Sequence, residues 1–184
     1  LTHFPISDHP VKAERIVSLD IARRRLLNQR LSGAKFDTAQ EAVRWLGAVQ
    51  SQDYAGAKWA LAMRINGVTD AQLDQAFADG AILRTHVMRP TWHFVTPEDI
   101  RWLLRLTAPR VHSFNAYYYR QRGLDEAIFG RAHEVLVKTL AGGKQLTRAE
   151  IEPALRQAGI NMEGEQVFGT ILMHAELEAV ICSG

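Results

Sequence analysis

The spacing of hydrophobic residues changes near residue 82, and this change limits the folds open to the chain. Before it, apolar side chains recur at helical intervals in four segments, at about 19–31, 38–49, 56–65 and 70–79. From Ile82 to Val95 the sequence is instead rich in β-branched and aromatic residues, with Arg89-Pro90 in the middle. This pattern predicts a β-hairpin. Helices followed by a hairpin are the order of a winged-helix unit.

The second half of the chain has a similar order of expected elements. They are a helix from Pro97, a helix at 125–140, a helix capped by Thr147, a helix at 163–178 and the start of a strand at 179–182. Helices that end in a single strand indicate a second winged-helix unit that stops before its wing. Because a lone strand does not form a sheet, we expect the natural chain to continue beyond its last residue.

The predicted organisation is an N-terminal arm at 1–17, a first winged-helix unit at 18–97 and a truncated second unit at 98–184. The expected fold class is mainly α with small β-hairpins (α+β), arranged as tandem winged-helix units. The single cysteine, Cys182, excludes an internal disulfide. No apolar run approaches the roughly 20 residues of a membrane span, so we expect a cytoplasmic protein with no membrane partner.

The distribution of charge indicates nucleic acid more strongly than the net charge of +2 does. Between residues 100 and 124 there is no acidic residue, while arginines alternate with aromatic residues. The stretch contains Arg101, Arg105, Arg110, Arg120 and Arg122, with Phe114, Tyr117, Tyr118 and Tyr119 between them. Arginine combined with aromatic faces is typical of a nucleic-acid groove. The alternative is a helix with a solvated arginine face and a tyrosine-lined core.

A polar segment, Gln50-Ser51-Gln52-Asp53-Tyr54, follows the second predicted helix. At helical pitch the side chains of Gln50 and Gln52 would diverge by about 200°. They can contact one ligand only if the helix ends before them and the chain runs extended, where residues i and i+2 share a side. An ordinary polar helix terminus is the alternative interpretation.

The predicted hairpin carries Arg84, His86, Arg89 and His93. Arginine at the tip of a hairpin suits contact with phosphate or insertion into the minor groove. The alternative is a surface hairpin that buries Trp92. His86 and His93 could be neighbours across the ladder, but no third ligand has metal-binding spacing, so we predict no metal site.

Two further features narrow the function. The expected helix at 163–178 carries four glutamates and no lysine or arginine, so we expect it to pack against the protein rather than read the major groove. No P-loop, dinucleotide fingerprint or nucleophile elbow is present. We therefore predict no cofactor and no hydrolase of the ordinary triad type.

Several motifs together resemble a bacterial family, the AlkZ/YcaQ-like winged helix DNA-binding domain proteins. They are Leu27-Asn28-Gln29-Arg30-Leu31, Val49-Gln50-Ser51-Gln52-Asp53-Tyr54, Ile82-Leu83-Arg84-Thr85, Arg89-Pro90-Thr91-Trp92-His93-Phe94-Val95 and Ala175-Glu176-Leu177. The resemblance implies three tandem winged helices with a concave DNA-binding face, of which this chain supplies two. It also implies a glycosylase motif, Gln-aliphatic-Gln or Gln-aliphatic-Asp, at Gln50 and Gln52. Ser51 and the Arg89-Pro90 turn depart from the family pattern, which suggests a divergent branch.

The resemblance implies a DNA glycosylase that removes alkylated purines or unhooks crosslinks in double-stranded DNA. Gln50 and Gln52 would orient a water, and Asp53 would assist. The expected DNA-binding residues are Arg84, Arg89, His93, Arg101, Arg105 and Arg110. The alternative is a non-enzymatic DNA-binding protein or transcriptional regulator on the same scaffold, and a third hypothesis is a protein-interaction module that uses the acidic helix.

Overall fold

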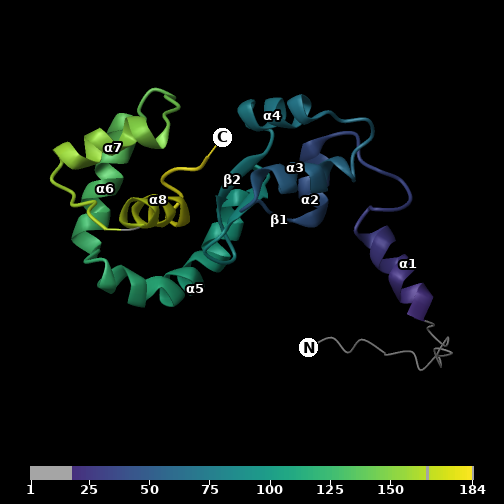
Figure 1. Cartoon of the computed structure of the whole chain (residues 1–184), viewed down its shortest axis with the longest axis horizontal. Helices are drawn as coiled ribbons and strands as arrows, with labels where there is room; N and C mark the ends of the chain where they lie inside the picture. Colours follow the sequence, from purple (N-terminus) through teal and green to yellow (C-terminus); the bar gives the residue numbers. More distant parts are fainter. Residues whose placement is uncertain (1–17, 165, 184) are drawn as a thin grey trace, which may run out of the picture. The chain divides into compact units, whose positions relative to one another are not determined.

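The structure, a computed structural model, describes residues 18–164 and 166–183, so the arm expected at 1–17 lies outside the described residues. Its elements, shown in Figure 1, are α1 (Ser18–Asn28), α2 (Ala39–Leu46), β1 (Val49–Gln50), α3 (Tyr54–Ala62), α4 (Asp70–Ala78), β2 (Leu83–His86), β3 (Trp92–Val95), α5 (Ile100–Gln121), α6 (Glu126–Thr139), α7 (Arg148–Gln157) and α8 (Val167–Leu177). The expected fold class, mainly α with a small antiparallel sheet, is confirmed. The tandem winged-helix arrangement stays a prediction.

The chain divides into two compact units at residue 35. In the described part of the first unit lies α1, and the second unit, residues 36–184, contains all the other elements. Within the second unit, α8 contacts β2 directly. The boundary expected at 97/98 stays a prediction.

The helix α2 begins and ends where local signals place its ends. Thr38 accepts a hydrogen bond from the Glu41 backbone N–H, and the Glu41 carboxylate accepts one from the Thr38 backbone N–H, which is the predicted capping box. The helix ends at Leu46 because Gly47 takes a positive φ of 76°, a conformation that favours glycine. It therefore stops before Gln50, and the chain continues as the short strand β1.

The predicted hairpin forms, and β1 joins it to give a three-stranded antiparallel sheet in the order β1-β3-β2. Gln50 pairs with His93, Thr85 also pairs with His93, and His86 pairs with Trp92. His86 and His93, which could have been neighbours across the ladder, are not paired, because the register is offset by one residue and their side chains point to opposite faces of the sheet.

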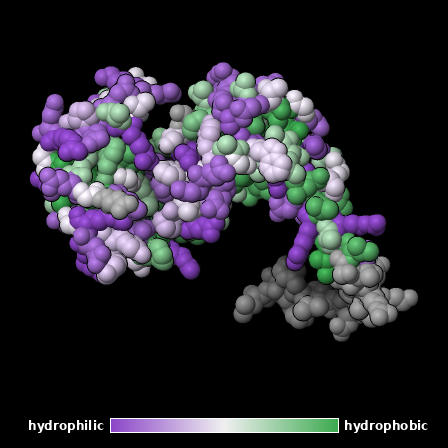
Figure 2. All heavy atoms as spheres, viewed as in Figure 1, coloured by the Kyte–Doolittle hydropathy of each residue, from purple (hydrophilic) through white to green (hydrophobic). Residues whose placement is uncertain are grey.

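The sheet contributes to two hydrophobic clusters of the second unit. Phe94 packs with Val43 and Leu61 from α2 and α3. The next residue, Val95, packs with the helices α5 to α8, because successive side chains of a strand point to opposite faces. On the face drawn in Figure 2, hydrophilic side chains are interspersed with hydrophobic ones over α6 and α7, two helices of the second cluster.

The C-terminal elements differ in part from the expectation. The last helix, α8, is almost entirely buried, including Glu176, as expected for a packing helix. Residues 179–182 do not form the expected strand. Ala179 takes a positive φ of 57°, so the chain turns after α8 and returns to the sheet only at Ser183, which forms an isolated antiparallel bridge with Arg84. None of the described helices has the length and apolar character needed to cross a bilayer.

Candidate nucleic-acid site

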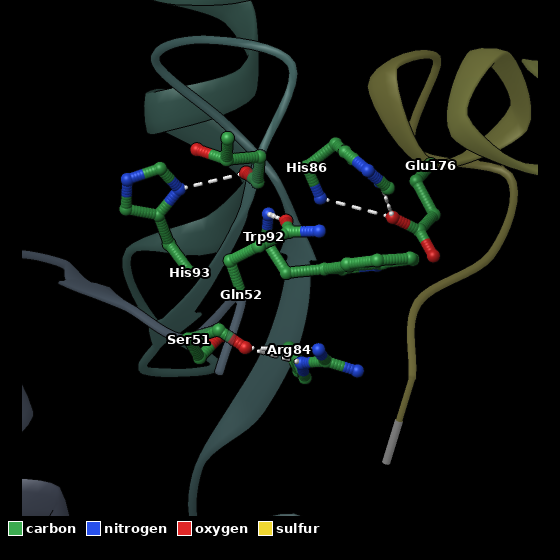
Figure 3. A network of polar contacts seen from close by, with 8 residues as sticks. Ser51, Gln52, Arg84, His86, Trp92, His93 and Glu176 are labelled. Atoms are coloured by element: carbon green, nitrogen blue, oxygen red, sulfur yellow. Dashed lines mark hydrogen bonds and ion pairs between the residues drawn. The ribbon is translucent and has the colours of Figure 1, made fainter. Parts of the chain in front are cut away.

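The segment that holds Gln50 and Gln52 runs extended and is fixed through Ser51. Ser51 is fully buried, whereas the two glutamines on either side of it are exposed, so both amides lie on the opposite side of the chain from Ser51. The Ser51 N–H donates to the Trp92 carbonyl at 2.7 Å. The Ser51 carbonyl accepts from Nε and Nη2 of Arg84, at 3.2 and 2.9 Å (Figure 3). The hairpin therefore fixes the Ser51 backbone through both its N–H and its carbonyl group.

Each of the two amides is oriented by one hydrogen bond from the hairpin. Arg89 Nη2 donates to Oε1 of Gln50 at 2.8 Å, and the Trp92 backbone N–H donates to Oε1 of Gln52 at 3.3 Å. An amide oxygen has two lone pairs, so each carbonyl keeps one for a ligand or a water. Asp53 differs from them, because its carboxylate caps α3 by accepting from the Gly56 N–H at 3.1 Å.

Two neighbouring cavities open beside the amides. Gln52 lines the larger, about 630 Å³, which we call the Gln52 cavity. Gln50 lines the other, about 480 Å³, which we call the Gln50 cavity. Pro90 and Phe114 line both cavities. Among the described residues no aspartate or glutamate lines either, whereas each contains two arginines, Arg122 and Arg148 in the first and Arg89 and Arg110 in the second.

Trp92 forms a wall of the Gln52 cavity and is in contact with cationic side chains. The guanidinium carbons of Arg84 and Arg148 lie 4.5 and 5.1 Å from its ring centroid, within the range of cation–π attraction. Burial lowers the pKa of Arg84; nearby Glu176 opposes this effect and Arg148 adds to it. An arginine nonetheless stays protonated at neutral pH, so the positive charge beside Trp92 is permanent.

The expected DNA-binding residues do not all lie at this site. Arg89 and Arg110 share the Gln50 cavity, whereas Arg101 and Arg105 line a separate cavity that also contains Glu178. The structure therefore brings only some of the predicted arginines to the amides. Their contacts with DNA stay predictions.

Two of the predicted DNA-binding residues, Arg84 and His93, instead make contacts within the protein. Arg84 is half-buried and holds the Ser51 carbonyl. His93 is 5% exposed, and its Nδ1 lies 2.9 Å from the Thr91 carbonyl oxygen. Burial lowers the pKa of His93, which favours the neutral ring. Its burial leaves little surface for the DNA contact that was predicted.

The Gln52 cavity combines one residue of the predicted basic stretch with residues that were not predicted. Arg122, from that stretch, lies at the end of α5 and donates to Thr170 Oγ1 and to Gln166 Oε1, both at 3.0 Å, whereas Arg148 of α7 was not predicted. Glu176 from α8 does not line this cavity but accepts hydrogen bonds from His86, which does. No local pattern in the sequence links these residues, since they come from separate helices. Among the described residues no group of His, Cys, Asp and Glu is arranged to hold a metal ion.

The fold and the site define a mostly helical protein with a small sheet and two neighbouring arginine-lined cavities, each with one of the two glutamines in its lining. The model of the family described as "DNA glycosylase AlkZ-like" matches residues 43–184. The chain therefore belongs to the AlkZ-like DNA glycosylase family, which confirms the resemblance seen in its motifs.

A solved structure has the same fold. The chain superposes on the Streptomyces sahachiroi DNA glycosylase AlkZ with a TM-score of 0.73 and 24% sequence identity, over 87% of this chain and 44% of that one. It thus spans less than half the length of that protein. The search of curated proteins gave no match to the chain.

Proposed function

We propose that the protein is a DNA-repair glycosylase that hydrolyses the N-glycosidic bond of alkylated or crosslinked bases in double-stranded DNA. The observation that carries this proposal is the exposure of Gln50 and Gln52 on one side of an extended segment, beside cavities lined by arginine and by no acidic residue among those described. Work on chromosomal DNA would place the protein in the bacterial cytoplasm. The winged-helix description of both halves of the chain is part of the same proposal.

The chemistry suits neutral amides. Cleavage of an N-glycosidic bond passes through a cation-like state at the sugar, as in glycoside hydrolysis. An alkylated purine that already carries a positive charge leaves readily. The protein therefore mainly has to place a water and stabilise the positive charge on the sugar. The free lone pairs of the Gln50 and Gln52 carbonyls can do both without ionising, and no cofactor is needed.

The neighbouring groups support this arrangement. Because Arg89 and the Trp92 N–H fix the two amides, their dipoles are oriented before the reaction begins, which is the condition for electrostatic stabilisation of a transition state. Arg110 and Arg148 are exposed at the two cavities and are placed to hold phosphates. Asp53 remains a proposed assistant, although its carboxylate also caps α3.

A base-release assay tests the proposal. The protein at its natural length is incubated with duplexes that contain one N7-methylguanine, and the rates for Gln50→Ala and Gln52→Ala are compared with that of Gln157→Ala, an exposed glutamine at the end of α7. We expect each of the first two changes to slow release by about 10²-fold or more and the control to leave it unchanged. Undiminished release in both variants would contradict the catalytic assignment.

One observation favours a second candidate function, a non-enzymatic DNA-binding protein or regulator. Both amide carbonyls already accept a hydrogen bond from the hairpin, which is also what a purely structural role would require. In that case the protein binds DNA but releases no base, and the glutamine variants bind as the unaltered protein does. Base release by the unaltered protein, measured beside its binding to a labelled duplex by fluorescence anisotropy, separates the two functions.

A further inference from the structure

A histidine that lines the Gln52 cavity forms a buried pair with a glutamate. His86 on β2 and Glu176 on α8 are 6% and 3% exposed. Oε2 of Glu176 accepts from the His86 backbone N–H at 2.9 Å and lies 2.5 Å from the ring Nδ1 (Figure 3). One carboxylate oxygen thus fixes both the backbone and the ring of His86. A partner on Nδ1 also sets the tautomer, because it keeps the hydrogen on that nitrogen.

His86 is one of the residues that line the Gln52 cavity. Its Nδ1 is committed to Glu176, and no partner for Nε2 occurs among the described residues. The Trp92 ring lies 4.4 Å from the imidazole, centroid to centroid, and closes one side of it. An imidazole that is oriented by a carboxylate and lines a binding cavity, with its second nitrogen free of a protein partner among the described residues, is the arrangement used in general acid–base catalysis.

The charged groups around the ring come from several elements. Glu176 of α8 is the direct partner, Arg84 of β2 and Arg148 of α7 lie over the Trp92 ring, and Arg122 of α5 lines the cavity. His93 on β3 is near enough to interact electrostatically with His86. Among these described groups Glu176 is the one anion. Its negative charge compensates for the nearby positive charges when the His86 ring carries a second proton.

We propose that His86, positioned by Glu176, donates a proton to the departing base, so that the site releases neutral modified purines as well as cationic ones. This inference rests on the proposed glycosylase function. A cationic alkylated purine leaves as a neutral molecule and needs no proton, whereas a neutral purine would leave as an anion. Protonation of the leaving group therefore matters for the second class of lesion and hardly for the first.

The step balances with water as the second reactant. The bond between the sugar C1′ and the base nitrogen breaks, and its electron pair stays on the base. Nε2 of the imidazolium gives its proton to a ring nitrogen of the base, while Nδ1 keeps its hydrogen toward Glu176. The water oriented by Gln52 adds to C1′ and releases a proton, which returns His86 to its starting form.

The test compares two lesions in the same duplex, N7-methylguanine as the cationic base and 1,N6-ethenoadenine as the neutral one. The protein at its natural length is assayed from pH 6 to 9 beside three variants. His86→Asn keeps an amide N–H near the position of Nδ1 but has no group in place of Nε2. Glu176→Gln keeps the imidazole and removes the anion. His133→Asn is the matched control, because His133 lies on α6 and does not line the Gln52 cavity.

We expect the unaltered protein to release both bases, with release of the neutral one slowing as the pH rises. His86→Asn should slow ethenoadenine release at pH 7 by about 10²-fold and flatten its pH profile, while N7-methylguanine release changes by less than about 3-fold. Glu176→Gln should move the pH-dependent limb for ethenoadenine to lower pH. If His86→Asn does not fold, as judged by thermal melting, the shift of the ethenoadenine pH profile in Glu176→Gln tests the inference by itself.

Two outcomes would overturn the inference while leaving the glycosylase function intact. One is a protein that releases N7-methylguanine but no ethenoadenine, and the other is an equal loss of both activities in His86→Asn. A protein that releases neither base would instead contradict the proposed function, and the inference would fall with it.

Discussion

Ser51 lies between the two proposed catalytic amides and has an unusual environment. Its side chain is fully buried, and its Oγ has no hydrogen-bond partner among the described residues. The motif that the resemblance implies has an aliphatic residue at this position, which suits a buried side chain. A buried hydroxyl without a partner loses its hydrogen bonds to water and regains none on folding. Ser51 therefore holds the segment through its backbone, while its buried hydroxyl lowers the stability of the folded protein.

Replacement of this hydroxyl tests that interpretation. We expect Ser51→Ala to leave the free energy of unfolding unchanged or to raise it by about 1 kcal/mol, measured by urea denaturation. Thr38→Ala is the contrasting variant, because the Thr38 hydroxyl caps α2, and its loss should cost about 1 kcal/mol. A loss of stability in Ser51→Ala as large as that in Thr38→Ala would indicate that the Ser51 hydroxyl has a partner.

At the scale of single elements, α8 combines burial with titratable groups. His174, in the last turn of the helix, is 7% exposed and stacks on Phe129, with ring centroids 3.7 Å apart. Its Nδ1 lies 3.2 Å from Nε2 of His133 on α6. Burial, followed by the charges of His112 and His133, lowers the pKa of His174 to about 3 from an ordinary value of 6.5. Packing of α8 therefore depends on a neutral imidazole.

The sign of the pH dependence follows from this lowered pKa. As the pH falls, the unfolded chain binds the proton before the folded protein does. The free energy of unfolding therefore has its full value above about pH 6.5 and falls progressively as the pH approaches 3. For one such group the free energy of unfolding should fall by about 1.4 kcal/mol per pH unit in this window. Thermal or urea unfolding from pH 4 to 7 measures the slope.

A variant assigns the slope to this residue. We expect His174→Phe to reduce it by the contribution of one histidine, while part remains because burial also lowers the pKa of His133. Phenylalanine keeps an aromatic ring against Phe129, which limits the loss of packing. Equal slopes in the two proteins would mean that His174 does not set the acid sensitivity of α8.

At the scale of the whole molecule, the proposed binding surface depends on charge placement rather than on net charge. The chain carries a formal charge of only +2, but arginines gather at the two cavities beside the amides, where the structure describes no acidic lining. Neutralised phosphates release counterions, so affinity for DNA should fall steeply as salt rises. A small net charge is compatible with this behaviour because only the local surface faces the phosphates.

A charge-matched pair of variants tests the surface. We expect Arg110→Gln, at the Gln50 cavity, to reduce the slope of log affinity against log salt by about 1. Arg131→Gln removes an equal charge from an exposed position on α6 that lines neither cavity and should change the slope little. Titration of a labelled duplex at several salt concentrations provides the slopes, and the same slope in all three proteins would exclude a phosphate contact at Arg110.

Local signals account for the elements that sequence reasoning predicted well. The capping boxes at Thr38 and Thr147 and the hairpin around Arg89-Pro90 each depend on residues a few positions apart. The expected strand at 179–182 failed for the opposite reason, since a strand exists only where a partner offers a free edge. In the described part of this segment a single residue, Ser183, pairs with the sheet, in an isolated bridge to Arg84 of β2.

By itself the sequence determined the helices, the hairpin and the position of the paired glutamines, because helical period, caps and turn residues act over a few neighbours. Only the tertiary structure decided that both amides face outward from a fixed Ser51 and that Arg101 and Arg105 lie at a different cavity. It also decided that Glu176 meets His86 across 90 residues of chain. Such contacts depend on how the helices pack around the sheet, and no local pattern encodes that packing.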